Sequence, residues 1–171
     1  EQLRIPQPDN NLGVGSGTQA AQTAAIMVGF EKELQENRPD LVLVVGDVTS
    51  TMACAITAKK LCIDVAHVEA GIRSGDLTMP EEINRIVTDS ITDIFFTTTQ
   101  EASQTLEASG KTADSIFFVG NTMIDTLFQN LENLQAPAWW NEEEFTSKEY
   151  FLVTLHRPAN VDDMNNLVNL L

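Results

Sequence analysis

The sequence has few basic residues, and this scarcity limits what the protein can bind. Lys and Arg number 10 against 25 Asp and Glu in 171 residues, and the formal net charge is −15. This balance argues against nucleic acid and against anionic membrane surfaces, because affinity for both depends on clustered Lys and Arg. A small anionic ligand is still compatible with it, because such a ligand needs only a few local donors.

Long apolar runs and a leader-like opening are also missing. No stretch of about 18 apolar residues occurs, so we expect no membrane span. No basic-then-apolar opening segment precedes the first strand, and residue 1 is Glu rather than Met. We therefore expect a cytoplasmic protein, and we expect that residue 1 is not the natural translation start.

Cysteine is rare as well. Cys54 and Cys62 are the two cysteines of the chain, eight residues apart. On one helix they would lie about 12 Å apart, too far for a disulfide, and a metal site would need more ligands at closer spacing. We predict two reduced thiols and no metal site.

What is present is a regular alternation of apolar runs and helical patterns. The loop-like segment 1–17 is followed by a helix at 18–36, where apolar residues recur at a spacing of four. The run LVLVV is apolar at every position, as in a strand covered on both faces. Further strands are expected at 64–69, 93–98 and 116–119, and further helices at 49–61, 81–91, 100–109 and 121–133. Strands separated by helices predict an α/β fold, with right-handed crossovers and a parallel, Rossmann-like sheet.

The alternation of predicted strands and helices stops near residue 134. Residues 134–149 combine proline, two adjacent Trp and a charge run, which is typical of a linker. YFLVTL, at 150–155, predicts a new strand, and a helix-like tail follows it. We therefore expect a domain at 1–133, a linker at 134–149 and the beginning of a second domain at 150–171.

Polar residues follow the strands where a parallel sheet binds its ligands, at the carboxyl ends. Asp47 follows the first strand, Glu69 ends the second, and the loop after it leads to Glu81 and Arg85. A carboxylate at the end of an apolar strand is partly desolvated, which favours a function for Glu69. Crowded carboxylates also shift one another's pKa, as acid/base catalysis requires. These residues predict an active-site edge.

Plainer interpretations stay open for each of these residues. Glu81 and Glu82 suit the first turn of a helix that begins with Pro80, where acids complement the helix dipole. Asp47 is also compatible with an N-cap of the next helix. His67 lies inside a strand, and we expect it to be structural. Among the basic residues, three stand just after strands: Arg73, Arg85 and Arg157.

Five motifs in order give the sequence a family resemblance. They are RPDLVLVVGD, HVEAGIRSGD, TMPEEINRIVTD, FFVGNTMIDTL and LVTLHRPAN, and the likeness extends from about residue 11 to residue 160. The sequence resembles the non-hydrolysing UDP-N-acetylglucosamine 2-epimerases. The resemblance implies a two-domain fold of the glycosyltransferase-B class and interconversion of UDP-GlcNAc and UDP-ManNAc by elimination and re-addition of UDP. It also implies a homodimer as the full-length protein, no cofactor and a role in surface-polysaccharide precursor synthesis.

The resemblance also assigns roles to residues. Asp47, Glu69 and Glu81 match the acidic catalytic set of the family, and Arg85 and His156 match positions that contact UDP. Gln22 matches, in a weaker alignment, a regulatory UDP-GlcNAc site, although a solvated helix residue is the interpretation we favour slightly. A hydrolysing epimerase that releases ManNAc and UDP, a related glycosyltransferase, and a non-catalytic nucleotide-sugar-binding piece are the alternatives.

Two parts of the family pattern are not found in these 171 residues. The Gly-Thr-Arg-Pro-Glu loop would precede residue 1, and a glycine-rich segment of the second domain would follow Leu171. Both help to bind the nucleotide, so we predict that the 171-residue chain alone does not turn over UDP-GlcNAc. Incubation with UDP-GlcNAc and chromatography of the products checks this, and appreciable UDP-ManNAc would contradict it.

Overall fold

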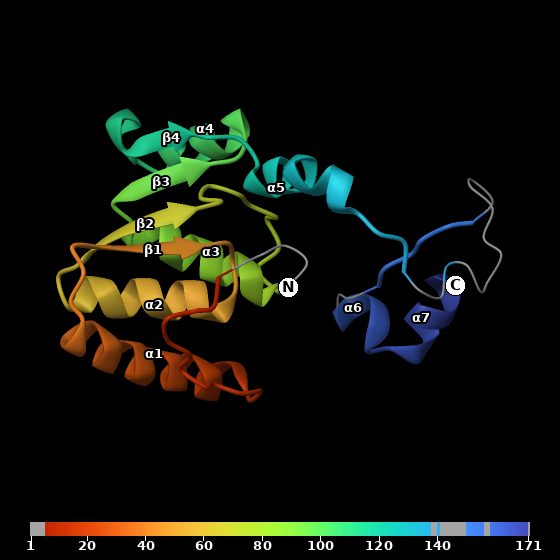
Figure 1. Cartoon of the computed structure of the whole chain (residues 1–171), viewed down its shortest axis with the longest axis horizontal. Coiled ribbons are helices and arrows are strands. Elements are labelled where there is room, and N and C mark those ends of the chain that lie inside the picture. The colour runs from red at the N-terminus through yellow and green to blue at the C-terminus, as the bar shows by residue number, and fades with distance from the viewer. Residues whose placement is uncertain (1–5, 138–139, 141–149, 156–157, 171) are drawn as a thin grey trace. The chain divides into compact units, whose positions relative to one another are not determined.

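The computed structural model describes residues 6–137, 140, 150–155 and 158–170, and its elements alternate along the chain as the sequence predicts (Figure 1). In chain order, the described helices and strands are α1 (Gln19–Glu36), β1 (Leu41–Val45), α2 (Thr49–Lys60), β2 (Asp64–Val68), α3 (Pro80–Ile91), β3 (Ile94–Thr97), α4 (Gln100–Ala108), β4 (Ile116–Phe118), α5 (Thr122–Asn130), α6 (Pro158–Val161) and α7 (Met164–Leu170). Short 3₁₀ turns are η1 (Ala113–Ser115) and η2 (Leu131–Asn133).

The structure departs from the expected elements at two places. The helix expected at 121–133 divides into α5 and the 3₁₀ turn η2. Residues 150–155, expected to form a strand, have no strand assignment. A strand exists only when a neighbour accepts its backbone hydrogen bonds, and the described residues supply no such neighbour to this segment. The apolar pattern at 150–155 was therefore not sufficient for a strand in this chain.

The four strands form one parallel sheet in the order β1-β2-β3-β4. Val44 lies opposite His67, and Val45 lies opposite Val68. The turns after β1 and β2 consequently leave the sheet side by side, at its carboxyl edge. The predicted parallel α/β fold is confirmed.

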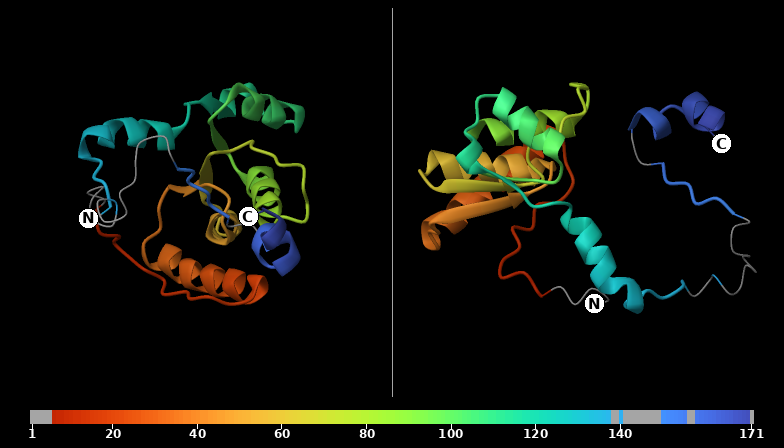
Figure 2. Two further views of the ribbon diagram at one scale, coloured as in Figure 1. Left: turned by 90° about the vertical axis from the view of Figure 1, so that its right-hand side faces the viewer. Right: turned by 90° about the horizontal axis from the view of Figure 1, so that it is seen from above.

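Helices pack on the sheet in the order of the chain. α2 contacts β1 and β2, α1 packs on α2, α3 contacts α2 and β2, and α4 contacts β3 and β4. Each new strand pairs at the same growing edge of the sheet. Right-handed crossovers therefore place α2, α3 and α4 on one face of the sheet, as Figure 2 shows. Exposure along β1 alternates accordingly: Val42 and Val44 are buried, whereas Leu41, Leu43 and Val45 are exposed.

Two apolar clusters make up the core beneath these helices. The larger one joins α1, α2, β1 and β2, and a smaller one joins the end of β2 to β3 and α4; their buried residues are Leu34, Val42, Val44, Ala55, Ala58, Ile63 and Val65 in the first, and Ala70, Phe95 and Leu106 in the second. Both clusters lie under the strands whose carboxyl ends carry the polar residues.

Polar side chains fix the ends of the helices on which the site depends. The Thr18 hydroxyl accepts a hydrogen bond from the Ala21 amide at 3.3 Å and caps the beginning of α1. The guanidinium of Arg38 donates to the Leu61 carbonyl at 2.8 Å, just beyond the end of α2. Such a donor satisfies a carbonyl that the helix leaves unpaired. α2 is thereby fixed at the end that lies away from the site.

The chain divides into two compact units, Glu1–Glu132 and Asn133–Leu171. The first holds the sheet and its helices. The second contains the two short helices α6 and α7, which pack on one another.

Gly71 occupies a position that only glycine fits. Its φ is +80°, and a Cβ placed on it would lie 2.3 Å from the carbonyl oxygen of Ala102 in α4. Both the left-handed conformation and the close approach of α4 therefore require a residue without a side chain. Gly75 lies in the next loop at φ +74°, but nothing lies within 4 Å of its hypothetical Cβ.

We expect Gly71→Ala to lower the free energy of unfolding by about 3 kcal/mol, because backbone strain and overpacking add. Gly75→Ala is the matched control, with strain alone and an expected loss of about 1 kcal/mol. Urea denaturation of both variants measures the difference. Equal losses would show that the Ala102 contact does not constrain Gly71.

Candidate active site

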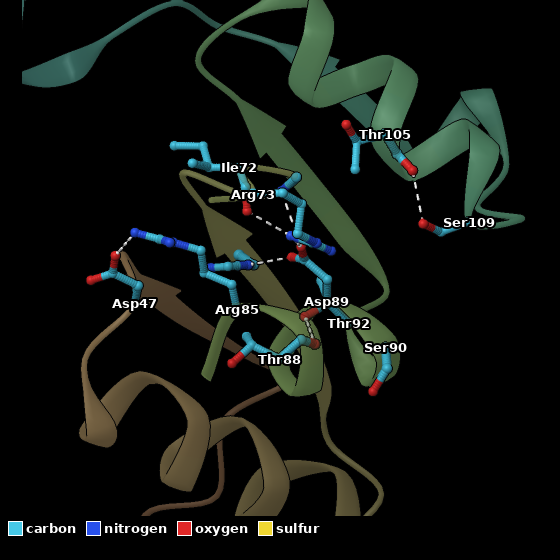
Figure 3. A network of polar contacts seen from close by, with 12 residues as sticks. Asp47, Ile72, Arg73, Arg85, Thr88, Asp89, Ser90, Thr92, Thr105 and Ser109 are labelled. Carbon is cyan, nitrogen blue, oxygen red and sulfur yellow. Dashed lines mark hydrogen bonds and ion pairs between the residues drawn. The ribbon is translucent and has the colours of Figure 1, made fainter. Parts of the chain in front are cut away.

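Asp47 and Arg85 form an ion pair across the carboxyl edge of the sheet. Asp47 lies in the turn after β1, and the Arg85 guanidinium, from the second turn of α3, donates to its Oδ2 (Figure 3). The amide of Asn84 donates to the backbone carbonyl of Asp47 at 2.8 Å. The N-cap of α2 is Val48, without a side-chain hydrogen bond, so the interpretation of Asp47 as a helix N-cap was wrong.

Arg85 also binds Glu82, the neighbour of the predicted site residue Glu81. Its Nη1 lies 3.2 Å from Glu82 Oε2. The Glu82 side chain is 2% exposed and accepts hydrogen bonds from the amides of Ser74 and Gly75 at 2.9 and 3.1 Å. One buried carboxylate thus holds both the loop before α3 and the arginine of the site.

The protonation of Glu82 follows from these contacts. Burial alone would raise its pKa, but the hydrogen bonds from the Ser74 and Gly75 amides, from Arg85 and from the Ser74 side chain together lower it below its ordinary value of 4.5. From the sequence, Glu82 was predicted only as a first-turn acid of its helix. Its i, i+3 spacing to Arg85 was the available signal, and the choice between the two adjacent glutamates needed the loop geometry.

Glu69 occupies an unusual backbone conformation at the end of β2. Its φ is +70°, in the left-handed region that side chains other than glycine rarely adopt. The residue is half-buried, and its Oε2 lies 3.8 Å from the position that a Cβ on Gly46 would take. The carboxylate of Glu69 therefore reaches the turn that carries Asp47. Strained residues of this kind cost of order 1–3 kcal/mol and concentrate at functional sites.

Glu81 and Gln22 line one pocket of about 490 Å³, whose walls come from α1, α2 and α3 and from the loop before α1. The Gln22 amide donates to the Gly15 carbonyl at 3.2 Å, which ties α1 to the glycine-rich segment before it. The family resemblance assigns these two residues to different sites, whereas the structure brings them to the same cavity. The other lining residues are Asn11, Leu12, Gly13, Val14, Gln19, Ile26, Val48, Thr49, Ser50, Cys54, Pro80 and Asn84.

The thiol of Cys54 forms part of this pocket wall. Burial raises its pKa to about 11, so at neutral pH it is protonated and contributes an uncharged surface. Neither Cys54 nor Cys62 is in a disulfide. Cys54 is half-buried and Cys62 is exposed, and the reduced state of both thiols stays a prediction.

His67 and Asp89 lie beneath the two turns. The His67 ring is fully buried, with Nδ1 2.7 Å from Asp89 Oδ1 and Nε2 2.8 Å from the Gly46 carbonyl oxygen. Asp89 Oδ2 accepts from Arg73 at 2.6 Å (Figure 3). The same oxygen accepts from the Gly71 amide at 3.1 Å. Arg73 is therefore engaged in an internal ion pair. The position of His67 inside a strand predicted a structural residue, and its partner Asp89 was not predicted.

Several expectations fall outside these contacts. His156 and Arg157 lie outside the described residues, so their predicted positions are untested. Among the described residues, no group of three or more His, Cys, Asp or Glu side chains is arranged to hold a metal ion. No helix within the described ranges has both the length and the apolar character needed to cross a membrane.

An open parallel sheet with acids and an arginine at its carboxyl edge defines a Rossmann-like α/β protein of the kind that binds ligands at that edge. The family model of UDP-N-acetylglucosamine 2-epimerase matches residues 1–171, and the chain belongs to this family.

Individual relatives agree with this assignment. The chain is 45% identical over 174 residues to a UDP-N-acetylglucosamine 2-epimerase of Methanocaldococcus jannaschii, covering 99% of this chain and 47% of the relative. It is 38% identical over 172 residues to a UDP-2,3-diacetamido-2,3-dideoxy-D-glucuronate 2-epimerase of Pseudomonas aeruginosa, covering 99% of this chain and 48% of the relative. The chain thus spans about half the length of the curated relatives it matches.

Solved structures show the same similarity. The M. jannaschii UDP-GlcNAc 2-epimerase in complex with UDP-GlcNAc and UDP matches with a TM-score of 0.84 at 42% identity, over 97% of this chain and 46% of that one. An epimerase from Rickettsia bellii matches with a TM-score of 0.85 at 31% identity, over 98% and 46%. Such epimerases have the glycosyltransferase-B-like fold, as the sequence predicted.

The contacts of Glu82 predict a specific acid sensitivity. Because its folded pKa lies below the unfolded value, the ionised carboxylate stabilises the fold above about pH 4.5, and this stabilisation is lost as pH falls through the folded pKa. We expect Glu82→Gln to be less stable than the parent at neutral pH, with a difference that shrinks as the solution is acidified below that range.

Thermal denaturation between neutral pH and acid measures this difference. Glu101→Gln, at an exposed first-turn acid of α4, is the control that should leave the profile unchanged. A constant gap between Glu82→Gln and the parent at every pH would contradict the prediction.

Proposed function

We propose that the whole protein to which this chain belongs is a non-hydrolysing UDP-GlcNAc 2-epimerase. The observation that carries the proposal is the convergence of Asp47, Glu69 and Arg85 at the edge where the parallel strands β1 and β2 end, in a chain of this family. The relative with 42% identity that binds UDP-GlcNAc and UDP supports the choice of substrate.

The reaction we propose inverts carbon 2 of the sugar. The proton leaves carbon 2 while UDP departs from carbon 1, which gives 2-acetamidoglucal and UDP. A proton then adds to the opposite face of carbon 2, and UDP returns to carbon 1. Both faces need an acid or a base, and the hydrogen at carbon 2 is not acidic, so several positioned carboxyl groups suit the chemistry. We assign these roles to Asp47, Glu69 and Glu81, without dividing the faces among them.

Arg85 supplies the positive charge for the departing UDP in this proposal. A guanidinium presents paired donors to phosphate oxygens, and it stabilises negative charge most where that charge develops. Within the fold the Arg85 donors are engaged by Asp47 and Glu82. Binding of a diphosphate would therefore share or displace the contact with Asp47, which couples the nucleotide to one of the acids.

Other roles extend the proposal. His156 is assigned to UDP binding by its motif. Gln22 is assigned to a regulatory UDP-GlcNAc site, and its position in the same pocket as Glu81 supports communication between that ligand and an acid of the site. The homodimeric state, the absence of a cofactor and the cytoplasmic location are predictions of the same kind, as is a role in surface-polysaccharide precursor synthesis.

Two other outcomes are distinguished by their products and substrates. A hydrolysing epimerase would release ManNAc and UDP from the same starting material. An enzyme that prefers a UDP-linked diacetamido uronic acid is the second alternative. It is supported by the 38% identity to the P. aeruginosa UDP-2,3-diacetamido-2,3-dideoxy-D-glucuronate 2-epimerase. Incubation of the whole protein with each UDP-sugar, followed by NMR of the products, separates these outcomes; exclusive formation of free ManNAc would replace the non-hydrolysing proposal.

We expect Asp47→Asn, Glu69→Gln and Glu81→Gln in the whole protein to lower kcat for epimerisation by about 100-fold or more, since each removes a proton-transfer group. Glu101→Gln is the control at a surface carboxylate and should keep the parent rate. Steady-state kinetics with UDP-GlcNAc measure both. A variant with parental kcat would remove that acid from the catalytic set.

A further inference from the structure

The fully buried His67 lies between two groups that can only accept hydrogen bonds. Nδ1 lies 2.7 Å from Asp89 Oδ1 and Nε2 lies 2.8 Å from the carbonyl oxygen of Gly46. A neutral imidazole carries one N–H and one lone pair, so either tautomer would set a lone pair against one of these oxygens. Only a ring with both protons donates in both directions.

The charges around the ring favour this state. Arg73 Nη1 lies 2.6 Å from Asp89 Oδ2, so the Asp89 carboxylate is paired with a cation on the oxygen that does not face the ring. Asp89, 3% exposed, then faces two cations, Arg73 from the loop and His67 from β2. A buried charge persists only when it is paired and hydrogen-bonded, and both ring nitrogens meet that condition.

The two partners of His67 belong to the two turns of the candidate site. Gly46 precedes Asp47 after β1. Asp89 accepts the amide of Gly71, two residues beyond Glu69. The chain of contacts from Gly46 through His67 and Asp89 to Gly71 therefore connects the backbone of the Asp47 turn to that of the Glu69 turn.

We propose that His67 is a doubly protonated positioning residue that, with Asp89, holds the Asp47 and Glu69 turns at a fixed separation. His67 itself touches no reacting atom in this proposal. Its effect on epimerisation rests on the proposed function, because it acts through the two acids. Its protonation and its hold on the turns are properties of the fold and do not depend on that function.

Nitrogen-15 NMR of the imidazole at neutral pH tests the protonation state in the whole protein. Both ring nitrogens of His67 should show directly bonded protons and the shifts of protonated nitrogen. The assignment comes from comparison with His67→Gln. An unprotonated ring nitrogen would overturn the proposal.

His67→Gln tests the hold on the turns, because its amide can still donate to Gly46 while the link to Asp89 is lost. We expect the Gly71 amide to exchange its hydrogen faster, and kcat to fall by about 100-fold with little change in KM, as for misplaced catalytic groups. Thr57→Val is the control: it removes a buried hydroxyl in α2 that donates to the Ala53 carbonyl, and should cost stability without changing kcat.

The outcomes separate the two proposals. Unchanged Gly71 exchange in His67→Gln, or a parental kcat in that variant, would overturn the positioning role. A parent protein that epimerises no UDP-sugar would overturn the proposed function alone, and the NMR and exchange measurements would still decide the role of His67.

Discussion

Parallel pairing of β1 with β2 sets Val45 opposite Val68, and the turns that follow these strands consequently emerge together at the sheet edge. Everything at the candidate site depends on this register. Asp47 and Glu69 meet because their strands end at the same level, and α3 brings Arg85 and Glu82 to them from the crossover that joins β2 to β3. A slip of one residue would turn every side chain of a strand to the other face.

The positive charges of the site are few, and the protein's own carboxylates hold them. Arg85 lies between Asp47 and Glu82, and Arg73 binds Asp89. In a chain of net charge −15, these internal pairs keep local cations at an edge that would otherwise repel an anion. The strongly acidic composition and a proposed anionic substrate are therefore compatible, because the local arrangement decides what approaches the edge.

Sequence reasoning succeeded where the signal was local and failed where it was not. The run LVLVV and the apolar spacing of α1 predicted β1 and α1 nearly to the residue. The expected cover on both faces of β1 was wrong for the described residues, because only Val42 and Val44 are buried. The role of Glu82 and the partner of His67 could not be predicted, since both depend on contacts between segments about 7 to 22 residues apart. The motifs identified the acids, whereas the left-handed backbone of Glu69 needed coordinates.

The strand order has a consequence for how the site comes into being. Each strand pairs with the next one in the chain, so the sheet can lengthen by one strand and one helix at a time, and each new pairing needs a whole crossover helix first. Parallel pairing of this kind is slow compared with local helix contacts, and domains begin to fold while the chain is still being synthesised. The edge that carries Asp47 and Glu69 would then be assembled as soon as α3 has packed, before β4 leaves the ribosome.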